Sequence, residues 1–248
     1  MTSAHFNFNE DKPFVEVLHA NDLTKRYGDE VAIANVSFSV AAGEIIGIVG
    51  PNGAGKTTLL EVLAGQIALD SGNVVWRGQA LPAPRRKEAI FYMPDGIRPY
   101  QDRFAGDVLR FVSGVYERSR TVVSNVITAV ELAPVLRKRV SALSKGYNRR
   151  LLLAIGLLTP QDVLLMDEPF DGFDIRQSRN IIQVLRNSAA GGRTLVLAIH
   201  QLADAERVCD RFLLLAGGKV RGIGTLQELR TQTALPEGSL EDIFLALT

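Results

Sequence analysis

The stretch that decides the fold is Gly50-Pro-Asn-Gly-Ala-Gly-Lys56-Thr57, which matches the pattern G-x-x-x-x-G-K-[ST] without a gap. It follows a short apolar run, Glu44–Val49, and opens Gly55–Ala64, whose residues have helical spacing. Glycines let the backbone curl so that successive N–H groups point inward, and the helix N-terminus adds positive partial charge. The sequence therefore predicts a phosphate-binding loop between a strand and a helix.

Two side chains of this loop carry the expected phosphate chemistry. Lys56 is expected to reach the β- and γ-phosphates of a nucleotide, and the Thr57 hydroxyl is expected to ligate Mg²⁺. The alternative is a chance match in a glycine-rich turn. The position between a predicted strand and a predicted helix favours the functional interpretation, because it is the context that this loop requires.

A second set of polar residues follows two buried strands. The stretch Val163–Asp167 is apolar up to its last residue, Asp167, and Glu168 follows directly. The stretch Thr194–Ile199 is followed by His200. We expect Asp167 to hold Mg²⁺, directly or through water, and Glu168 to polarise an attacking water. His200 is expected at the same carboxyl edge of the sheet, where it can donate to a γ-phosphate. The alternatives are an acidic pair that caps the next element and a histidine with a structural role.

Strands and helices alternate along most of the chain, which predicts an α/β fold with a mainly parallel sheet covered on both faces. Further strands are expected at Phe14–Leu18, Val36–Val40, Asn73–Trp76, Ile90–Met93, Phe212–Leu215 and Lys219–Ile223, and further helices at Ile175–Ser188, Leu202–Val208 and Ser239–Leu247. We expect residues 1–248 to form a single domain, with a catalytic core in 14–94 and 160–224, a helical insertion at about 95–159 and C-terminal helices in 225–248.

The composition excludes several classes of protein. Apolar residues make up 46% of the 248 residues and charged residues 22%, and the formal net charge is +1, which argues against a polyanion-binding tail or a charge-driven disordered chain. The single cysteine, Cys209, excludes an intramolecular disulfide framework. No stretch reaches the roughly 18 apolar residues of a membrane span, and Met1–Asp11 lacks the features of a signal peptide. We therefore expect a soluble or peripheral protein.

From about Val15 to Leu247 the sequence resembles the ATP-binding cassette (ABC) family, with the motifs in the family order. The resemblance rests on Tyr27, the loop Gly50–Thr58, the stretch Leu143–Gly146, the pair Asp167-Glu168 and His200. It implies a phosphate-loop NTPase core of the ABC-ATPase type, with a mainly parallel sheet, an N-terminal antiparallel β subdomain and an α-helical insertion. It also implies that the protein binds ATP and Mg²⁺.

The resemblance assigns a role to each matching residue. It implies catalysis by Glu168, His200 and Lys56, and a metal site formed by Thr57, Asp167 and Asp95. Nucleotide contacts are expected from Tyr27, Asn52, Gly53, Gly55, Lys56, Thr57, Thr58, Ser144 and Gly146, with the Tyr27 ring stacking on adenine.

The stretch Leu143-Ser-Lys-Gly146 resembles the signature motif, which other phosphate-loop NTPases lack. Ser144 can cap the helix that follows, and its hydroxyl and the Gly146 N–H would form a second anion site. In the family this site contacts the γ-phosphate held by the opposite protomer, so the resemblance implies an ATP-sandwich dimer. Tyr147 departs from the glutamine that usually follows in the family. The alternative is an ordinary N-cap before a core helix.

The larger departure is Asp95, in Met93-Pro94-Asp95, where the family generally has glutamine. That residue links the nucleotide metal to the helical insertion and to the partner subunit. Aspartate can ligate Mg²⁺, but it adds a negative charge and lacks an amide donor. We therefore expect Asp95 to reach the metal through water.

The predicted helical insertion contains helical apolar rows from Val108 to Tyr116 and from Val122 to Val130, and a third helix is expected at Lys145–Leu158. Residues 132–161 also carry six basic and no acidic residues, namely Arg137, Lys138, Arg139, Lys145, Arg149 and Arg150. These six predict a solvated face or, alternatively, attraction to a membrane surface or to phosphates across the dimer.

The resemblance implies an ATP-hydrolysing subunit that powers a membrane transporter, with an integral membrane permease and a second cassette, identical or not, as partners. The end Leu240–Leu247 resembles the tails of cassettes that serve ABC-2-type exporters. We expect a cytoplasmic protein, peripheral on the inner face of the cell membrane through the permease, and no nucleic-acid partner, given the near-zero net charge. The permease is expected to dock at about residues 95–115, near Tyr100 and Phe104. The alternatives are a non-transport ABC ATPase and a regulatory ATP-binding module with weak hydrolysis.

Overall fold

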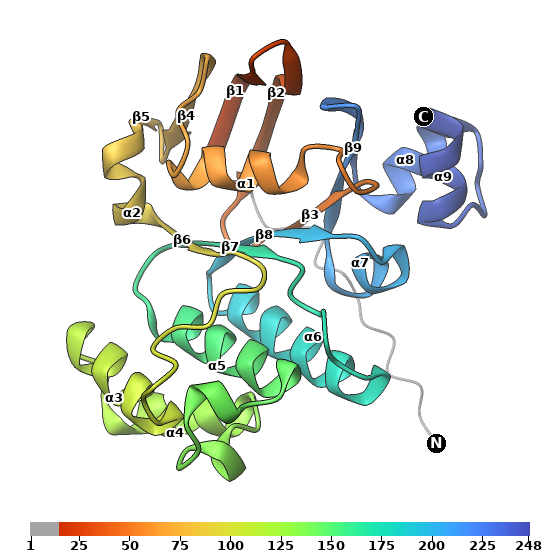
Figure 1. The fold of residues 1–248 in the computed structure, drawn as a ribbon. Helices are drawn as coiled ribbons and strands as arrows, with labels where there is room; N and C mark the ends of the chain where they lie inside the picture. Colours follow the sequence, from red (N-terminus) through yellow and green to blue (C-terminus); the bar gives the residue numbers. More distant parts are fainter. Residues whose placement is uncertain (1–14) are drawn as a thin grey trace.

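The computed structural model describes residues 15–248, so the segment Met1–Asp11, which was not expected to be a signal peptide, and the residue Phe14 lie outside this range. A mainly parallel sheet forms the centre of the molecule, with the strand order β10-β9-β3-β8-β7-β6 (Figure 1). Its strands are β3 (Ile45–Val49), β6 (Ile90–Met93), β7 (Val163–Asp167), β8 (Thr194–Ile199), β9 (Arg211–Ala216) and β10 (Lys219–Gly224). Only β10 pairs antiparallel in this sheet of the described chain, through its hairpin with β9.

The N-terminal part forms a second, antiparallel sheet with the order β2-β1-β4-β5. Its strands are β1 (Glu16–Tyr27), β2 (Glu30–Ala41), β4 (Ser71–Trp76) and β5 (Gln79–Ala80). The sequence predicted shorter strands here, at Phe14–Leu18, Val36–Val40 and Asn73–Trp76, and none at the position of β5. The observed strands are longer because β1 pairs with β2 on one side and with β4 on the other. This backbone pairing includes polar residues such as Lys25.

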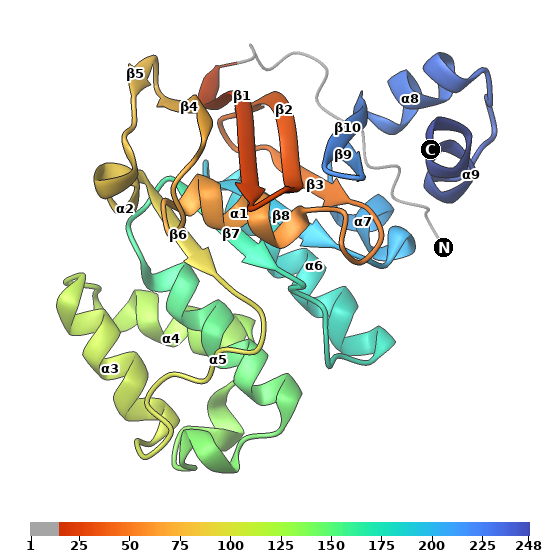
Figure 2. The same cartoon turned by 45° about the horizontal axis from the view of Figure 1, so that its top comes forward.

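Helices cover both faces of the central sheet, as the alternating order predicted (Figure 1). Helix α1 lies between the two sheets, and α5 and α6 lie on the opposite face. The helices are α1 (Lys56–Ala64), α2 (Arg86–Ala89), α3 (Ala105–Val115), α4 (Arg120–Ala129), α5 (Lys145–Leu158), α6 (Ile175–Ala190), α7 (Leu202–Val208), α8 (Leu226–Thr233) and α9 (Leu240–Leu247). The turned view separates α8 and α9, beside the β9–β10 hairpin, from the lobe of α3, α4 and α5 (Figure 2).

Each face of the central sheet has its own hydrophobic core. On β3, Ile46 and Ile48 pack with α1 and the antiparallel sheet, whereas Ile45 and Val49 belong to the core that contains α5 and α6. Successive side chains of a strand point to opposite faces, so a fully apolar strand fills both cores. Strand β3 is buried along its whole length, which fixes the position of the loop that leaves its end.

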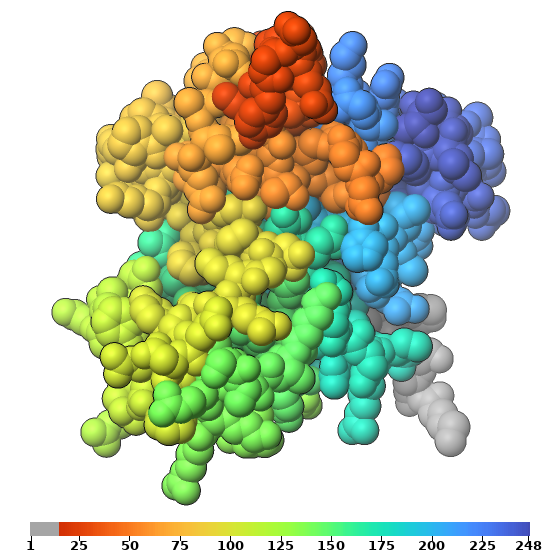
Figure 3. All heavy atoms as spheres, in the orientation of Figure 1, coloured from red at the N-terminus to blue at the C-terminus, as the bar shows by residue number. Residues whose placement is uncertain are grey.

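The lobe of α3, α4 and α5 lies in the lower part of the molecule in the space-filling view, beside the teal residues around α6 (Figure 3). The expectation of a solvated basic face is wrong for Arg149 and Arg150, which are 4% and 5% exposed. Arg150 donates to the Val130 carbonyl at 2.8 Å and to the Glu131 carboxylate at 2.6 Å. These two arginines are buried because α5 packs under the sheet and beside α4, where carbonyls and carboxylates accept their hydrogen bonds.

Within residues 15–248, none of the helices is long and apolar enough to cross a membrane.

Candidate active site

The predicted phosphate-binding loop joins the buried strand β3 to helix α1. Gly55 stands at φ 101° before the first residue of α1, and a Cβ there would lie 2.5 Å from the Ala32 carbonyl oxygen. At Gly50 a Cβ would lie 2.1 Å from the Leu215 carbonyl oxygen. These two positions therefore require glycine, the first for its left-handed backbone and both for the close approach of neighbouring backbone.

Lys56 lies inside the curled loop. Its ammonium Nζ donates to the Gly50 carbonyl at 2.8 Å and to the Pro51 carbonyl at 3.2 Å. The residue is only 7% exposed, so its positive charge is held inside the loop. This arrangement concentrates positive potential where a phosphate group would lie.

The acidic pair reaches the same place from β7. The Thr57 hydroxyl Oγ1 donates to Asp167 Oδ2 at 2.7 Å, which joins the start of α1 to the end of β7. Burial raises the pKa of the Asp167 carboxyl, the hydrogen bond from Thr57 opposes that rise, and the charge of Asp95 adds to it. A cation placed beside Asp167 would lower this pKa and favour the charged carboxylate, because opposite charge lowers a carboxyl pKa.

Glu168 and His200 meet across the adjacent parallel strands β7 and β8. The Glu168 carboxylate Oε2 accepts from the His200 backbone N–H at 3.3 Å and contacts His200 Nδ1. Glu168 has φ 50°, a left-handed conformation in which a non-glycine residue is uncommon. Glu168 contacts His200 and Asp167 accepts from Thr57, so the two neighbouring carboxylates face different groups.

A cavity of about 570 Å³ is lined by the phosphate-binding loop and by the acidic pair, whereas His200 is not among its lining residues. It also receives Tyr27 from the end of β1, whose ring is half exposed and has Lys25 Nζ 5.4 Å from its centroid. The predicted site residues that line the cavity are Tyr27, Asn52, Gly53, Gly55, Lys56, Thr57, Thr58, Asp95, Asp167 and Glu168. The volume lies within the range of about 300–1,000 Å³ typical of small-molecule sites.

Ser144 and Gly146 do not line this cavity. Ser144 caps α5, accepting the Tyr147 N–H at 3.4 Å, and a Cβ on Gly146 would lie 3.2 Å from the Gly172 carbonyl oxygen. Lys145, which lies between Ser144 and Gly146, forms an ion pair with Asp171, with its Nζ 2.6 Å from Oδ2. Within one chain the structure therefore leaves Ser144 and Gly146 apart from the phosphate loop, and their expected contact with a second cassette's nucleotide stays a prediction.

Asp95 lines the cavity, but its carboxylate forms an ion pair with Arg149 of α5. Arg149 was not expected from the sequence to be a site residue. Two features of the sequence could have pointed to this ion pair. Asp95 adds a negative charge near a phosphate site, and Arg149 belongs to the basic run before the acidic strand. The expected metal contact of Asp95 stays a prediction.

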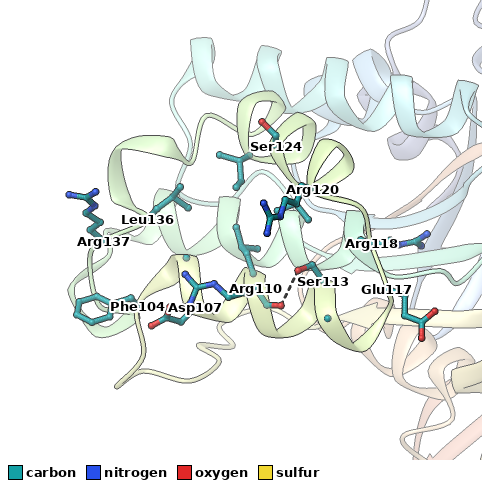
Figure 4. Close-up of a pocket in the computed structure, with 15 residues that line it drawn as sticks. Phe104, Asp107, Arg110, Ser113, Glu117, Arg118, Arg120, Ser124, Leu136 and Arg137 are labelled. Carbon is teal, nitrogen blue, oxygen red and sulfur yellow. Dashed lines mark hydrogen bonds and ion pairs between the residues drawn. The ribbon is translucent and has the colours of Figure 1, made fainter.

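Two further hollows lie in the helical part of the molecule. An apolar groove of about 250 Å³ is lined by Phe91, Ile97, Tyr100 and Phe111, among others. A larger hollow of about 1310 Å³ lies between α3 and α4, where the Arg110 and Asp107 side chains are paired at 2.9 Å (Figure 4). Phe104 lines this second hollow and not the groove that contains Tyr100, so the two residues expected to mark one docking surface belong to different ones.

A glycine loop between a strand and a helix, with its lysine and an acidic pair at the neighbouring strand end, defines a phosphate-loop nucleotide-binding protein. The chain belongs to the ABC transporter family: the sequence model of the family with that description matches residues 33–171, more than half of the chain. The fold is that of an ABC ATPase cassette, and the family binds ATP.

Named relatives and solved structures agree with this assignment. The chain is 33% identical over 218 residues to Nod factor export ATP-binding protein I of Rhizobium etli, covering 85% of this chain and 69% of that protein. It is 32% identical over 247 residues to the probable multidrug ABC transporter ATP-binding protein YbhF of Escherichia coli, covering 96% of this chain and 43% of that protein. A solved ATP-binding subunit of an ABC transporter superposes with a TM-score of 0.84 at 28% identity, covering 93% of this chain and 99% of that one.

Proposed function

We propose that this chain binds Mg-ATP in the 570 Å³ cavity and hydrolyses it to drive an exporter. The observation that carries the proposal is the convergence of Lys56, Thr57, Asp167 and Glu168 on one cavity from separate elements. These residues supply what phosphoryl transfer uses. Lys56 provides a buried positive charge, Thr57 and Asp167 provide oxygen ligands for Mg²⁺, and Glu168 provides a carboxylate, which lies next to His200.

The hydrolytic step needs a base and groups that stabilise the negative charge on the phosphate. We assign the base to Glu168, which would accept a proton as water attacks the γ-phosphorus and the bond to the ADP oxygen breaks. Lys56 would stabilise the charge on the phosphate oxygens, with the loop N–H groups. His200, held against Glu168, would donate to the γ-phosphate.

Thr57 and Asp167 fit a magnesium ion, because their adjacent oxygens are the hard ligands that Mg²⁺ prefers. In residues 15–248 there is no group of three or more His, Cys, Asp or Glu side chains that could hold a metal by themselves. That suits Mg²⁺, which usually binds through one or two carboxylates together with substrate phosphates and water. When bound, the ion would neutralise phosphate charge.

The transport part of the proposal has two supports. The relatives' names describe Nod factor export and a probable multidrug transporter, and the apolar groove beside the Asp95 loop offers a docking surface for a membrane-spanning subunit. We propose that this partner holds the chain at the cytoplasmic face of the membrane and that the lobe of α3, α4 and α5, about residues 95–159, contacts it. We also propose that two cassettes enclose ATP, with Ser144 and Gly146 facing the partner's nucleotide.

The docking prediction can be tested by cysteine cross-linking in native membranes. Tyr100→Cys should cross-link to a membrane-spanning protein, because Tyr100 is 52% exposed and lines the groove. The native Cys209 is buried and should not react. Leu245→Cys, 69% exposed on α9, is the matched control and should give no such product. Cross-linking of Tyr100→Cys to a ribosomal protein alone would support a non-transport ATPase.

Tyr27→Ala should weaken ATP binding about fivefold, because losing one stacking face costs on the order of 1 kcal/mol. A fluorescent ATP analogue titrated against the purified chain would measure this. Tyr100→Ala, equally exposed but outside the cavity, should bind like the parent protein. Equal affinity of the Tyr27 variant would remove adenine stacking from the role of Tyr27.

A regulatory ATP-binding module with weak hydrolysis is the second candidate, and the observation that favours it is the carboxylate of Asp95 at the cavity wall. Negative charge there would repel the γ-phosphate. Phosphate release by the purified chain with Mg-ATP separates the two functions. Turnover that depends on Lys56 supports the ATPase, whereas tight binding without release supports the module.

A further inference from the structure

Arg149 is a buried cation that the reaction outlined above does not use. Its guanidinium lies in the first turns of α5, in a residue that is 4% exposed. Nη2 forms the ion pair with Asp95 Oδ1, and Nη1 donates to the Asp167 backbone carbonyl at 3.4 Å. The Arg149 side chain therefore connects α5, the loop that carries Asp95 and the end of β7.

The preceding residue of α5 holds the same loop. Asn148 Nδ2 donates to the Ile97 carbonyl at 2.9 Å. The loop that carries Asp95 is thus fastened to α5 at its backbone by Asn148 and at its carboxylate by Arg149. Ile97 also lines the apolar groove, so the fastened loop separates the groove from the nucleotide cavity.

The charges explain why this fastening matters. Asp95 lines the cavity, and its side chain is 48% exposed, so its carboxylate adds negative potential beside the phosphate loop. Arg149 supplies the opposite charge from the protein side. A buried guanidinium without a partner is strongly unfavourable, so the two groups stabilise each other.

We propose that Arg149 is a positioning residue for ATP binding: it holds the Asp95 carboxylate against α5 and cancels its charge, so that the phosphates can enter the cavity. The proposal rests on the proposed function in requiring that the cavity binds ATP. In this arrangement the Asp95 carboxylate is the partner of Arg149.

Three variants of the full chain test the proposal. Arg149→Gln leaves the Asp95 charge facing the cavity and should lower ATP affinity about tenfold at low ionic strength, and clearly less at 0.5 M salt, because salt screens an exposed charge. Asp95→Asn in the same chain should recover affinity to within about threefold of the parent, since the pair then carries no charge. Arg149→Lys keeps the charge and should lose less affinity than Arg149→Gln.

The probes are Mg-ATP and ATP with EDTA, with thermal unfolding as the control for folding. Rescue by Asp95→Asn in both conditions supports a charge-cancelling role for Arg149. A double variant that binds no better than Arg149→Gln, or that loses affinity only with Mg²⁺ present, overturns the proposal. If Arg149→Gln does not fold, the double variant decides: folding with restored binding supports the role, and failure to fold makes Arg149 purely structural.

Failure of the two proposals can be told apart in the same titration. If the parent chain binds ATP and Arg149→Gln binds equally well, the proposed function stands and the role of Arg149 is wrong. If the parent chain shows no more binding than Lys56→Ala, both are wrong.

Discussion

Glu168→Gln is expected to lower the turnover of ATP by about 100-fold or more, the size of effect seen when a general base is lost. Glutamine keeps the shape of the side chain and can still accept the His200 backbone N–H, which the carboxylate accepts at 3.3 Å. What is lost is the carboxylate that would take the proton from water. ATP binding should persist, since the phosphate loop and Asp167 are unchanged.

Phosphate release and nucleotide affinity, measured on the same preparation, check this prediction. Size-exclusion chromatography with Mg-free ATP should also show a shift toward a dimer, because ATP that is not hydrolysed would hold two cassettes together. Glu241→Gln, which changes an exposed carboxylate on α9, is the matched control and should hydrolyse ATP at the parent rate. A rate for Glu168→Gln within a few-fold of the parent would remove Glu168 from the role of base.

Lys56→Ala should reduce ATP affinity by at least about 100-fold. The ammonium is the one formal positive charge within the loop, and a charge-assisted hydrogen bond contributes about 1.5–3 kcal/mol, so losing two such bonds to phosphate costs about 3 kcal/mol or more. The Lys56 ammonium donates to the Gly50 and Pro51 carbonyls, which holds it inside the loop.

Calorimetric titration with ATP would measure this loss, with thermal unfolding to show that the variant folds. Lys138→Ala is the control, because Lys138 is an exposed lysine of the helical lobe that lies outside the cavity. Unchanged affinity in Lys56→Ala would place the nucleotide elsewhere on the molecule.

The sequence by itself determined the elements whose signals are local. The loop after β3 follows from glycine spacing, and the helix predicted at Lys145–Leu158 agrees with α5 at both ends. Ser144 supplies its N-cap, and a fully apolar run identified β7 up to Asp167. Such features depend on residues within a few positions of each other, where backbone geometry and periodicity act directly.

Only the tertiary structure decided which distant groups share one site. Asp95 and Arg149 are 54 positions apart, and Glu168 and His200 are 32 apart. The basic run around Arg149 has the composition of a solvated face, yet Arg149 and Arg150 are buried because α5 packs under the sheet. The charge on Asp95 gains its meaning from that buried guanidinium, because the cost of burying one charge depends on where the opposite charge lies in space, and not on its distance along the chain.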